Sequence, residues 1–214
     1  MPSPFATASD AQRRMLEAAI DLFAERGLGG TSTRDIAARA QRSPAALYVH
    51  YPSKEHLLYA LSIFGHEGAL EALRSARDAH EDPALQVWEM IFAFSRWHME
   101  NARLGRVVQY ELHALSVEHR TEVVELRRRT HGVMIEALER GSAQGRFHID
   151  DLHATGRALL SLGIDLARWF DPSLPRDIAH LAGVNADLAL RIVGFHRSSP
   201  HPPGVRPNEG AITA

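Results

Sequence analysis

The spacing of its apolar residues constrains this chain more than any other feature of the sequence. Between Met15 and Phe195 the apolar side chains recur at intervals of three and four residues, and almost no stretch alternates apolar with polar residues. The first spacing is typical of one face of an α-helix, and the second is that of a half-buried β-strand. The sequence therefore predicts an all-α fold of about nine helices and no sheet.

Capping and breaking residues divide this pattern into separate helices. Ser9 or Asp10 can cap the first one, and Gly27 suits its left-handed end. Pro44 fits the first turn of a short later helix. The expected helices cover residues 10–26, 33–40, 54–79, 84–101, 104–116, 118–144, 151–170 and 184–196, with one more short helix from residue 43.

The composition is that of an ordinary globular protein, with 214 residues of which 45% are hydrophobic and 23% charged. Cysteine is absent, which fits a reducing compartment and removes disulfides and thiolate metal sites. No apolar stretch approaches the roughly 20 residues that span a bilayer, and residues 1–9 lack the pattern of a signal peptide. We therefore expect a soluble, cytoplasmic protein without a membrane partner.

Charge is distributed unevenly along the chain. The formal net charge is -2, which by itself gives no indication of a nucleic-acid partner. The segment from residue 28 to residue 54 differs, because it holds four basic side chains and one acidic one, namely Arg34, Arg39, Arg42, Lys54 and Asp35. One face of this segment is therefore expected to meet phosphate groups.

The same segment has the plan of a helix-turn-helix unit, in which two short helices pack on a longer one and the second enters a DNA major groove. Ile36 and Ala40 would face Leu47 across the turn and hold the two helices at a fixed angle. This spacing also fits any helical hairpin of an all-α protein, so the residue types have to decide between the two interpretations.

Five polar side chains favour the DNA interpretation because they lie at helix starts or on the exposed side of the short helices, namely Thr33, Ser43, Tyr48, His50 and Lys54. Each is weak evidence when taken alone. Thr33 and Ser43 fit as helix caps. Tyr48 fits as a core ring with a solvated hydroxyl, and Lys54 as a solvated cation. Together, in a basic segment, they predict DNA binding.

The run from Leu22 to Leu58, LFAERGLGGTSTRDIAARAQRSPAALYVHYPSKEHLL, resembles the N-terminal domain of the tetracycline-repressor (TetR) family. The matching positions, in order, are Leu22-Phe23, Gly27, Thr33, Ile36-Ala37, Ala40, Leu47-Tyr48, His50-Tyr51 and Lys54-Glu55. The resemblance implies a homodimeric regulator, usually a repressor, that binds double-stranded operator DNA. It also implies that residues 42–48 lie in the major groove and that the DNA backbone is held by Thr33, Tyr48, His50 and Lys54.

The turn between the short helices departs from the family pattern. Gln41 and Arg42 stand where a glycine and an apolar residue are usual, so Gln41 would have to adopt the backbone shape that glycine normally takes. Ala45 and Ala46 stand where glycine and threonine are common, which leaves these two positions only methyl contacts with thymine. Hydrogen-bonding readout then falls more heavily on Arg42, Ser43 and flanking residues. The full predicted DNA-binding set is Thr33, Arg34, Arg42, Ser43, Ala45, Ala46, Tyr48, His50 and Lys54.

Residues 118–195 resemble the sensor domain of an actinobacterial-type subset of the family. The shared features are an Arg-rich helix, the Gly-x-x-x-Gly-x-Phe turn made by Gly141, Gly145 and Phe147, and the Ala-Arg-Trp-Phe sequence of residues 167–170. Several relatives of this kind sense acyl-coenzyme A (acyl-CoA) thioesters. The resemblance therefore implies a small-molecule effector such as an acyl-CoA or another apolar acid.

A ligand pocket is expected where large aromatic side chains coincide with a few polar groups. The predicted ligand-binding residues are Trp88, Phe92, Trp97, Tyr110, Met134, Arg168 and Trp169. The plainer explanation for each aromatic residue is core packing. Arg168 needs an anionic partner in an otherwise apolar helix, and this partner is either a ligand carboxylate or phosphate or Asp165, one turn earlier.

The last two predicted helices are apolar on more than one side, which indicates burial on several faces. Packing of this pair against its copy would form a four-helix dimer interface, whereas the alternative is a deep core within one chain. The expected organisation is a flexible N-terminus at residues 1–9, a helix-turn-helix domain at 10–56, a ligand-binding and dimerisation domain at 57–197 and a disordered tail at 198–214.

Two other functions stay open on the sequence alone. A helical enzyme would need a catalytic or metal motif, but the thirteen histidines are scattered without a His-Glu-x-x-His pair, and no phosphate loop or nucleophile elbow occurs. We therefore expect no catalytic residue, no metal and no cofactor. The second alternative keeps the DNA-binding domain but replaces the small ligand by a protein partner or by dimerisation alone.

Overall fold

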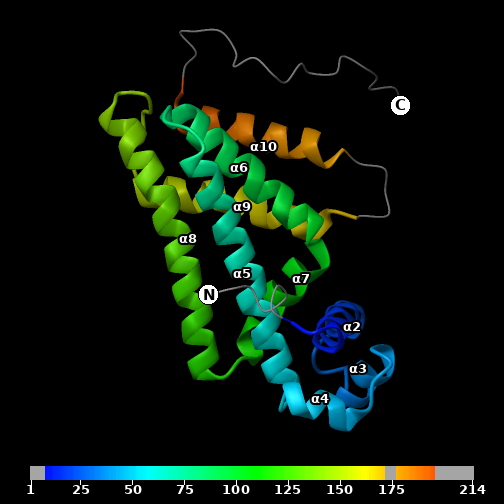
Figure 1. Ribbon diagram of the computed structural model, residues 1–214. Coiled ribbons are helices and arrows are strands. Elements are labelled where there is room, and N and C mark those ends of the chain that lie inside the picture. The colour runs from blue at the N-terminus through cyan, green and yellow to red at the C-terminus, as the bar shows by residue number, and fades with distance from the viewer. Residues whose placement is uncertain (1–7, 172–176, 196–214) are drawn as a thin grey trace.

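The computed structural model describes residues 8–171 and 177–195, and over these residues it contains helices and no strand (Figure 1). The α-helices are α2 (Asp10–Arg26), α3 (Thr33–Arg39), α4 (Pro44–His50), α5 (Lys54–Asp78), α6 (Pro83–Glu100), α7 (Ala102–Tyr110), α8 (Val117–Ala143), α9 (Leu152–Trp169) and α10 (Ile178–Ile192). A short 3-10 helix, η1 (Leu112–Ala114), lies between α7 and α8. The predicted all-α fold is thus confirmed for the described residues, while the predicted tail at 198–214 and residues 1–7 lie outside them. Within the same ranges, no helix combines the length and the apolar character that crossing a membrane requires.

The turn between α3 and α4 confirms the expectation about Gln41. Its φ is 54°, and it is the one non-glycine residue with a positive φ among the described residues. The backbone N–H of Arg42 donates to the carbonyl of Ala37 at 2.8 Å, so the chain closes the end of α3 as it does after many helices that stop at glycine. Gln41 therefore carries a conformational cost that glycine would avoid.

The last helix begins at Ile178 rather than at Val184, where the sequence analysis started it. The carboxylate of Asp177 accepts a hydrogen bond from the backbone N–H of His180 at 3.0 Å and caps α10 at this earlier point. Three buried alanines, Ala182, Ala186 and Ala189, then form the stripe on which α10 packs against α6. The six residues before Val184 were not predicted to be helical because the expected pattern was one of large apolar residues, and this stripe is made of small ones.

Three hydrophobic clusters hold the described residues together, and α5 contributes to the two larger ones. One cluster joins α2, α3 and α4 to the first half of α5 and to α7, and it includes Phe23, Leu47 and Leu61. The other joins the second half of α5 to α6, α8, α9 and α10 around Phe94 and Met134. The helix-turn-helix end therefore contacts the rest of the molecule mainly through α5 and α7.

Candidate DNA interface and effector cavity

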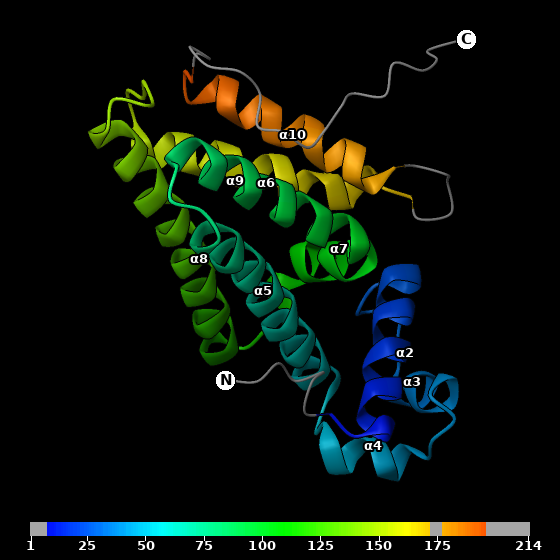
Figure 2. The same cartoon turned by 45° about the horizontal axis from the view of Figure 1, so that its top comes forward.

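The helices α3 and α4 form the end of the molecule that lies farthest from α10 (Figures 1 and 2). Tyr48 projects from α4 with an exposed fraction of 52%. Its hydroxyl lies 2.9 Å from Oγ1 of Thr33, in the first turn of α3. Ser43 caps α4 by accepting a hydrogen bond from the backbone N–H of Ala46 at 3.1 Å. The fold thus brings Thr33 and Tyr48 together at the surface, and Ser43 fulfils the capping role that its position suggested.

Two of the three arginines at this end are available to meet phosphate. Arg34 and Arg42 are exposed, and neither has an acidic partner within the described residues. Arg39 differs, because its guanidinium pairs with Glu25 at 3.2 Å. The acid of the segment, Asp35, accepts hydrogen bonds in the α3 capping box, and these bonds lower the pKa of its carboxyl group. Its negative charge is therefore held at the start of α3.

Lys54 has a further role that the sequence analysis did not predict. Its Nζ donates to the carbonyl oxygens of Leu28 and Thr31, both at 2.7 Å, and the side chain is half-buried. An ammonium group has three N–H donors, so these bonds leave one for a phosphate oxygen. Lys54 thus fastens the loop between α2 and α3 to the start of α5, whether or not it also contacts DNA.

The remaining predicted DNA contacts differ in exposure. Ala45 and His50 are exposed, near the two ends of α4, whereas Ala46 is half-buried and packs against the core beneath the helix. Val49, which the prediction omitted, has an exposed fraction of 79%. It lies four residues after Ala45 and therefore on the same helical face, a spacing that could have identified it. The face that α4 presents includes a branched apolar side chain as well as alanine.

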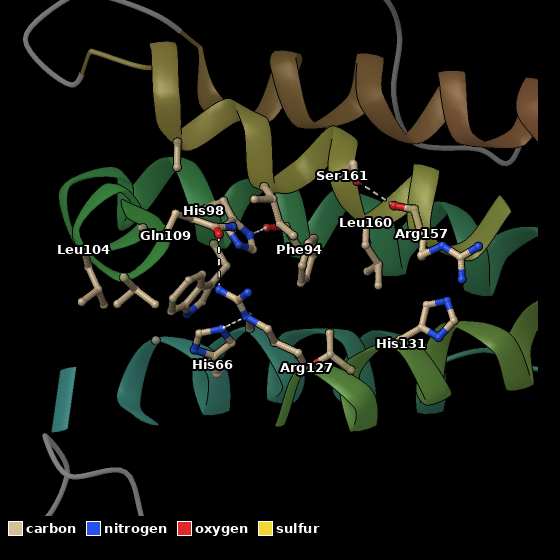
Figure 3. Close-up of a pocket in the computed structure, with 18 of the residues that line it drawn as sticks. His66, Phe94, His98, Leu104, Gln109, Arg127, His131, Arg157, Leu160 and Ser161 are labelled. Carbon is tan, nitrogen blue, oxygen red and sulfur yellow. Dashed lines mark hydrogen bonds between the residues drawn. The ribbon is translucent and has the colours of Figure 1, made fainter. Parts of the chain in front are cut away.

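A cavity of about 560 Å³ lies between α5, α6, α7, α8 and α9 (Figure 3). Its walls are mostly apolar and include Ala69, Phe94, Leu104, Val108, Leu160 and Ile164. Its volume is within the range of about 300–1,000 Å³ that small-molecule sites occupy. The chain therefore forms a partly open cavity of the size that a small-molecule site requires.

Arg127 is a half-buried cation that faces this cavity and has no ion pair with an acid among the described residues. The guanidinium of Arg127, on α8, donates through Nε to Nε2 of His66 at 2.9 Å and through Nη2 to Oε1 of Gln109 at 3.3 Å (Figure 3). The side chain is half-buried, and this burial lowers the pKa of the guanidinium. A positive charge is thus held at the cavity wall by neutral groups.

Sequence reasoning missed Arg127 because it is one of three consecutive arginines in a helix that looks solvated. A signal was present, since Val123 and Thr130 lie four residues before and three residues after it, and both are buried. A residue at this spacing borders the inner face of the helix. Arg129, two residues further, is exposed.

Two histidines that line the cavity are neutral. In His66 and His98, Nδ1 lies 2.8 Å from the carbonyl oxygens of Ser62 and Phe94 respectively. Burial lowers the pKa of each imidazole to about 4. Each Nδ1 therefore carries the proton and donates it to the carbonyl, which leaves Nε2 as a hydrogen-bond acceptor.

Further basic side chains line the cavity away from Arg127. His131 on α8 and Arg157 on α9 point toward each other at one end of the cavity (Figure 3). Arg128 also lines it, and both arginines are exposed to solvent. The cavity therefore combines an apolar interior with positive charge at its wall and at its solvent-exposed part.

The structure places the predicted ligand-binding residues in several different parts of the molecule. Trp97 does line the main cavity, where its indole lies close against Gly68 of α5. Tyr110 and Arg168 line a second hollow between α7 and α9 instead. Arg168 pairs with Asp165 at 3.2 Å and is exposed, so the plainer explanation for this cation holds.

The other four predicted residues line neither hollow. Met134 is fully buried in the core. Trp88 stacks on Phe92 and donates its indole N–H to Asp187 at 2.8 Å, so this aromatic pair packs toward α10. Trp169 has an exposed fraction of 47%. Aromatic spacing had identified helix faces correctly as apolar but could not show which of them border an empty space.

The helix α7 connects the cavity to the helix-turn-helix end. It contributes Leu104, Val108 and Gln109 to the cavity wall. At its end, Oε1 of Glu111 accepts a hydrogen bond from the backbone N–H of Leu28 at 3.1 Å. Arg103 pairs with Asp21 of α2 at 3.0 Å. A shift of α7 would therefore reach both parts of the molecule.

Family models match both parts of this structure. Residues 15–61 match the model for bacterial regulatory proteins of the tetR family. Residues 80–193, which are more than half of the chain, match the C-terminal domain of tetracyclin repressor-like proteins. The chain belongs to the TetR family. The prediction of a DNA-binding transcriptional regulator rather than an enzyme is confirmed by this membership.

Individual TetR-family members are similar over most of their length. A regulatory protein of the tetR family from Rhodococcus RHA1 is 40% identical, with a TM-score of 0.83 over 89% of this chain and 100% of that one. The HTH-type transcriptional repressor KstR2 of Mycobacterium tuberculosis is 29% identical over 164 residues, 75% of this chain and 82% of the relative. AibR, in complex with isovaleryl coenzyme A and operator DNA, is 23% identical with a TM-score of 0.71 over 88% of this chain and 100% of that one, which shows a shared fold.

Proposed function

We propose that this TetR-family regulator represses transcription by binding operator DNA as a homodimer, and that an apolar anion in the cavity releases it. The main observation that supports an anionic effector is Arg127, a half-buried cation that faces the cavity and has neutral hydrogen-bond partners. An anion gains most at such a position, because the surrounding protein screens the interaction less than water does. A carboxylate or phosphate also matches the paired N–H donors of a guanidinium.

An acyl-CoA thioester is the form of effector that fits the rest of the cavity. The apolar walls accept the acyl chain, and Arg128, His131 and Arg157 lie where the phosphates of coenzyme A would reach solvent. The relative AibR binds isovaleryl coenzyme A together with operator DNA, which supports this class. The relative KstR2 is a repressor, which supports repression as the role of the DNA-bound protein.

The route from effector to DNA runs through α7. An anion at Arg127 competes with Gln109 for the guanidinium and so alters the position of α7. Because Glu111 at the end of α7 holds Leu28, the movement tilts α2 and with it the helix-turn-helix unit. Two such units must lie about 34 Å apart to enter successive major grooves, so a tilt reduces affinity. The effector acts only by the difference in its affinity for the two arrangements.

Dimerisation is proposed to use α9 and α10. One face of α10 exposes Val184, Leu188 and Ile192, with exposed fractions of 42%, 38% and 46%. These residues are four apart and form a single apolar stripe, which a second copy of α10 would cover. Val184→Glu with Leu188→Glu should convert a dimer into a monomer in light scattering, and an unchanged mass would move the interface elsewhere.

We retain the predicted DNA-binding residues as the proposed interface, with Val49 added to Thr33, Arg34, Arg42, Ser43, Ala45, Ala46, Tyr48, His50 and Lys54. The proposed domains are residues 10–56 for DNA and 57–197 for effector binding and dimerisation. Because the target is operator DNA, we expect the protein to act in the cytoplasm. A domain used for dimerisation alone would have no need of an open interior, so the cavity favours a sensor.

The test is fluorescence anisotropy of the protein on its own upstream intergenic DNA, at two salt concentrations. Long-chain and aromatic acyl-CoA thioesters, the matching free acids and coenzyme A alone are added in turn. Release by thioesters but not by coenzyme A supports the proposal in full, and release by the acids alone restricts it to a carboxylate. Specific DNA binding that none of these compounds changes would refute the effector class while keeping the regulator.

A further inference from the structure

A second polar cluster lies at the junction of the two domains, away from the cavity. Glu55 and His56 belong to the first turn of α5, directly after the helix-turn-helix unit, and His119 belongs to the first turn of α8. One donor atom from each lies within 4.8 Å of the other two. We propose that Glu55, His56 and His119 form a binding site for a zinc-like divalent transition-metal ion.

The donor set is the first argument for a metal of this class. Two imidazole nitrogens with one carboxylate oxygen are a usual three-ligand set for Zn²⁺, whose fourth position is then taken by water. Magnesium and calcium prefer oxygen ligands alone, so two imidazoles disfavour them. Residues 56 and 119 are far apart in the sequence, which is why no metal motif was visible there.

The spacing of the donors is the second argument. Oε1 of Glu55 lies 2.7 Å from Nδ1 of His119, and Oε2 lies 3.4 Å from Nδ1 of His56. Metal bonds of about 2.0–2.1 Å in a tetrahedron hold neighbouring donors roughly 3.3 Å apart. The second distance already has this value, and the first reaches it by a small rotation of the carboxylate.

The surroundings hold the donors in place. The ring of Tyr59 stacks on His119 with 3.8 Å between centroids, and the hydroxyl of Tyr59 donates to Glu122. Packing of this kind orients the ligands of metal sites. Oγ of Ser53 lies 2.9 Å from Nδ1 of His56, the nitrogen that would bind the metal, so the ion has to replace this hydrogen bond. His131 and His153 also stack on each other, but they have no third donor beside them in the described residues and serve as a contrast.

The charge of Glu55 supports the same conclusion. Its carboxylate accepts hydrogen bonds from the backbone N–H of Ser116 at 2.9 Å and from His119, but no lysine or arginine pairs with it among the described residues. A divalent cation between the three side chains would balance this charge. It would also tie the start of α5 to the start of α8 and so stiffen the connection between recognition helix and cavity.

The experiment is titration of untagged, full-length protein with Co²⁺, whose visible absorption reports coordination by nitrogen ligands, followed by displacement with Zn²⁺. The variants are His56→Gln and His119→Gln, and the matched control is His113→Gln, an exposed histidine on η1. We expect saturable binding that Zn²⁺ reverses, with affinity at least about 10-fold weaker in both site variants and unchanged in the control.

A melting experiment guards against loss of folding. Zn²⁺ should raise the Tm of the wild type and of His113→Gln, because a ligand of the folded state stabilises it by mass action, and should leave His56→Gln unchanged. His56 is the most exposed of the three ligands, so its removal is tolerated best. No Co²⁺ spectrum in the wild type, or equal affinity in all four proteins, would overturn the site.

Discussion

The two ends of the molecule hold their arginines in opposite ways. At the helix-turn-helix end, Arg34 and Arg42 extend into solvent with no acid beside them in the described residues. In the cavity, Arg127 is half-buried between a neutral imidazole and an amide. Exposed cations attract any polyanion within a Debye length of about 8–10 Å, whereas a half-buried one meets only a ligand that fits beside it. The exposed arginines therefore suit a general attraction to DNA, whereas the half-buried Arg127 suits the selection of one small molecule.

The largest effect is expected from Arg127→Met, which keeps the length of the side chain and removes its charge. Loss of a charged hydrogen-bond partner in a partly buried site costs about 3 kcal/mol, so affinity for an acyl-CoA effector should fall by about 100-fold. Effector titration of the operator complex measures this loss. Arg129→Met, an exposed neighbour, is the matched control. Similar losses in both variants would contradict the special position of Arg127.

The stability of the protein should also depend on pH, because of a buried histidine beside the cavity. His98 is neutral in the fold because burial lowers its pKa from 6.5 to about 4, so the unfolded chain binds more protons between these values. Stability is therefore complete above about pH 6.5 and decreases as pH falls toward 4, by on the order of 3 kcal/mol. Urea unfolding across this range checks the direction. His98→Gln should make the profile less steep without abolishing it, because burial also lowers the pKa of His66 to about 4. An equally steep profile in this variant would assign the effect to other groups.

Lys54→Met tests whether this cation acts through structure or through phosphate. It removes the two hydrogen bonds to the carbonyls of Leu28 and Thr31, so unfolding free energy should decrease by about 2 kcal/mol. Arg34→Met removes an exposed charge and should leave stability nearly unchanged. Equal stability of the two variants in urea would show that Lys54 is an ordinary surface lysine.

At the helix-turn-helix end, we expect Arg42 to contribute to sequence discrimination and Arg34 to contribute to general affinity for DNA. Arg42→Ala should cost about 1–2 kcal/mol and reduce discrimination between operator and random DNA, since its position favours a base contact. Arg34→Ala should weaken both DNAs alike and reduce the salt slope by roughly one. Anisotropy titrations over a salt series distinguish the two patterns, and identical patterns would refute the division.

The smallest effect is expected at the turn. Gln41→Gly relieves the left-handed backbone of Gln41, whose φ is 54°, while it adds freedom to the unfolded chain. The net result of these two effects should be an increase of about 0.5 kcal/mol in the free energy of unfolding. Operator affinity should stay within a factor of two. Thermal melting measures the first and anisotropy the second. A lower Tm would mean that the glutamine side chain makes a contribution of its own.

Much of the fold could be predicted from local signals. Ser9, Gly27, Ser53 and Asp82 mark helix ends through hydrogen bonds to neighbours within a few residues, and the structure uses each of them in this way. The strained turn at Gln41 was also foreseeable, because the backbone shape needed there depends on the turn alone. Asp177 was missed since the helix it starts is held by small alanines rather than by large apolar residues.

The sequence by itself determined most of the helices and the helix-turn-helix unit, because these depend on contacts between residues close along the chain. It also determined the family, because the matching residues form one continuous run. Only the tertiary structure decided which arginines line the cavity, namely Arg127, Arg128 and Arg157 but not Arg168. It also brought Glu55 and His56 against His119 and turned Trp88 and Phe92 away from the cavity. An empty space is bounded by several helices at once, so no single helix pattern contains the information that identifies its walls.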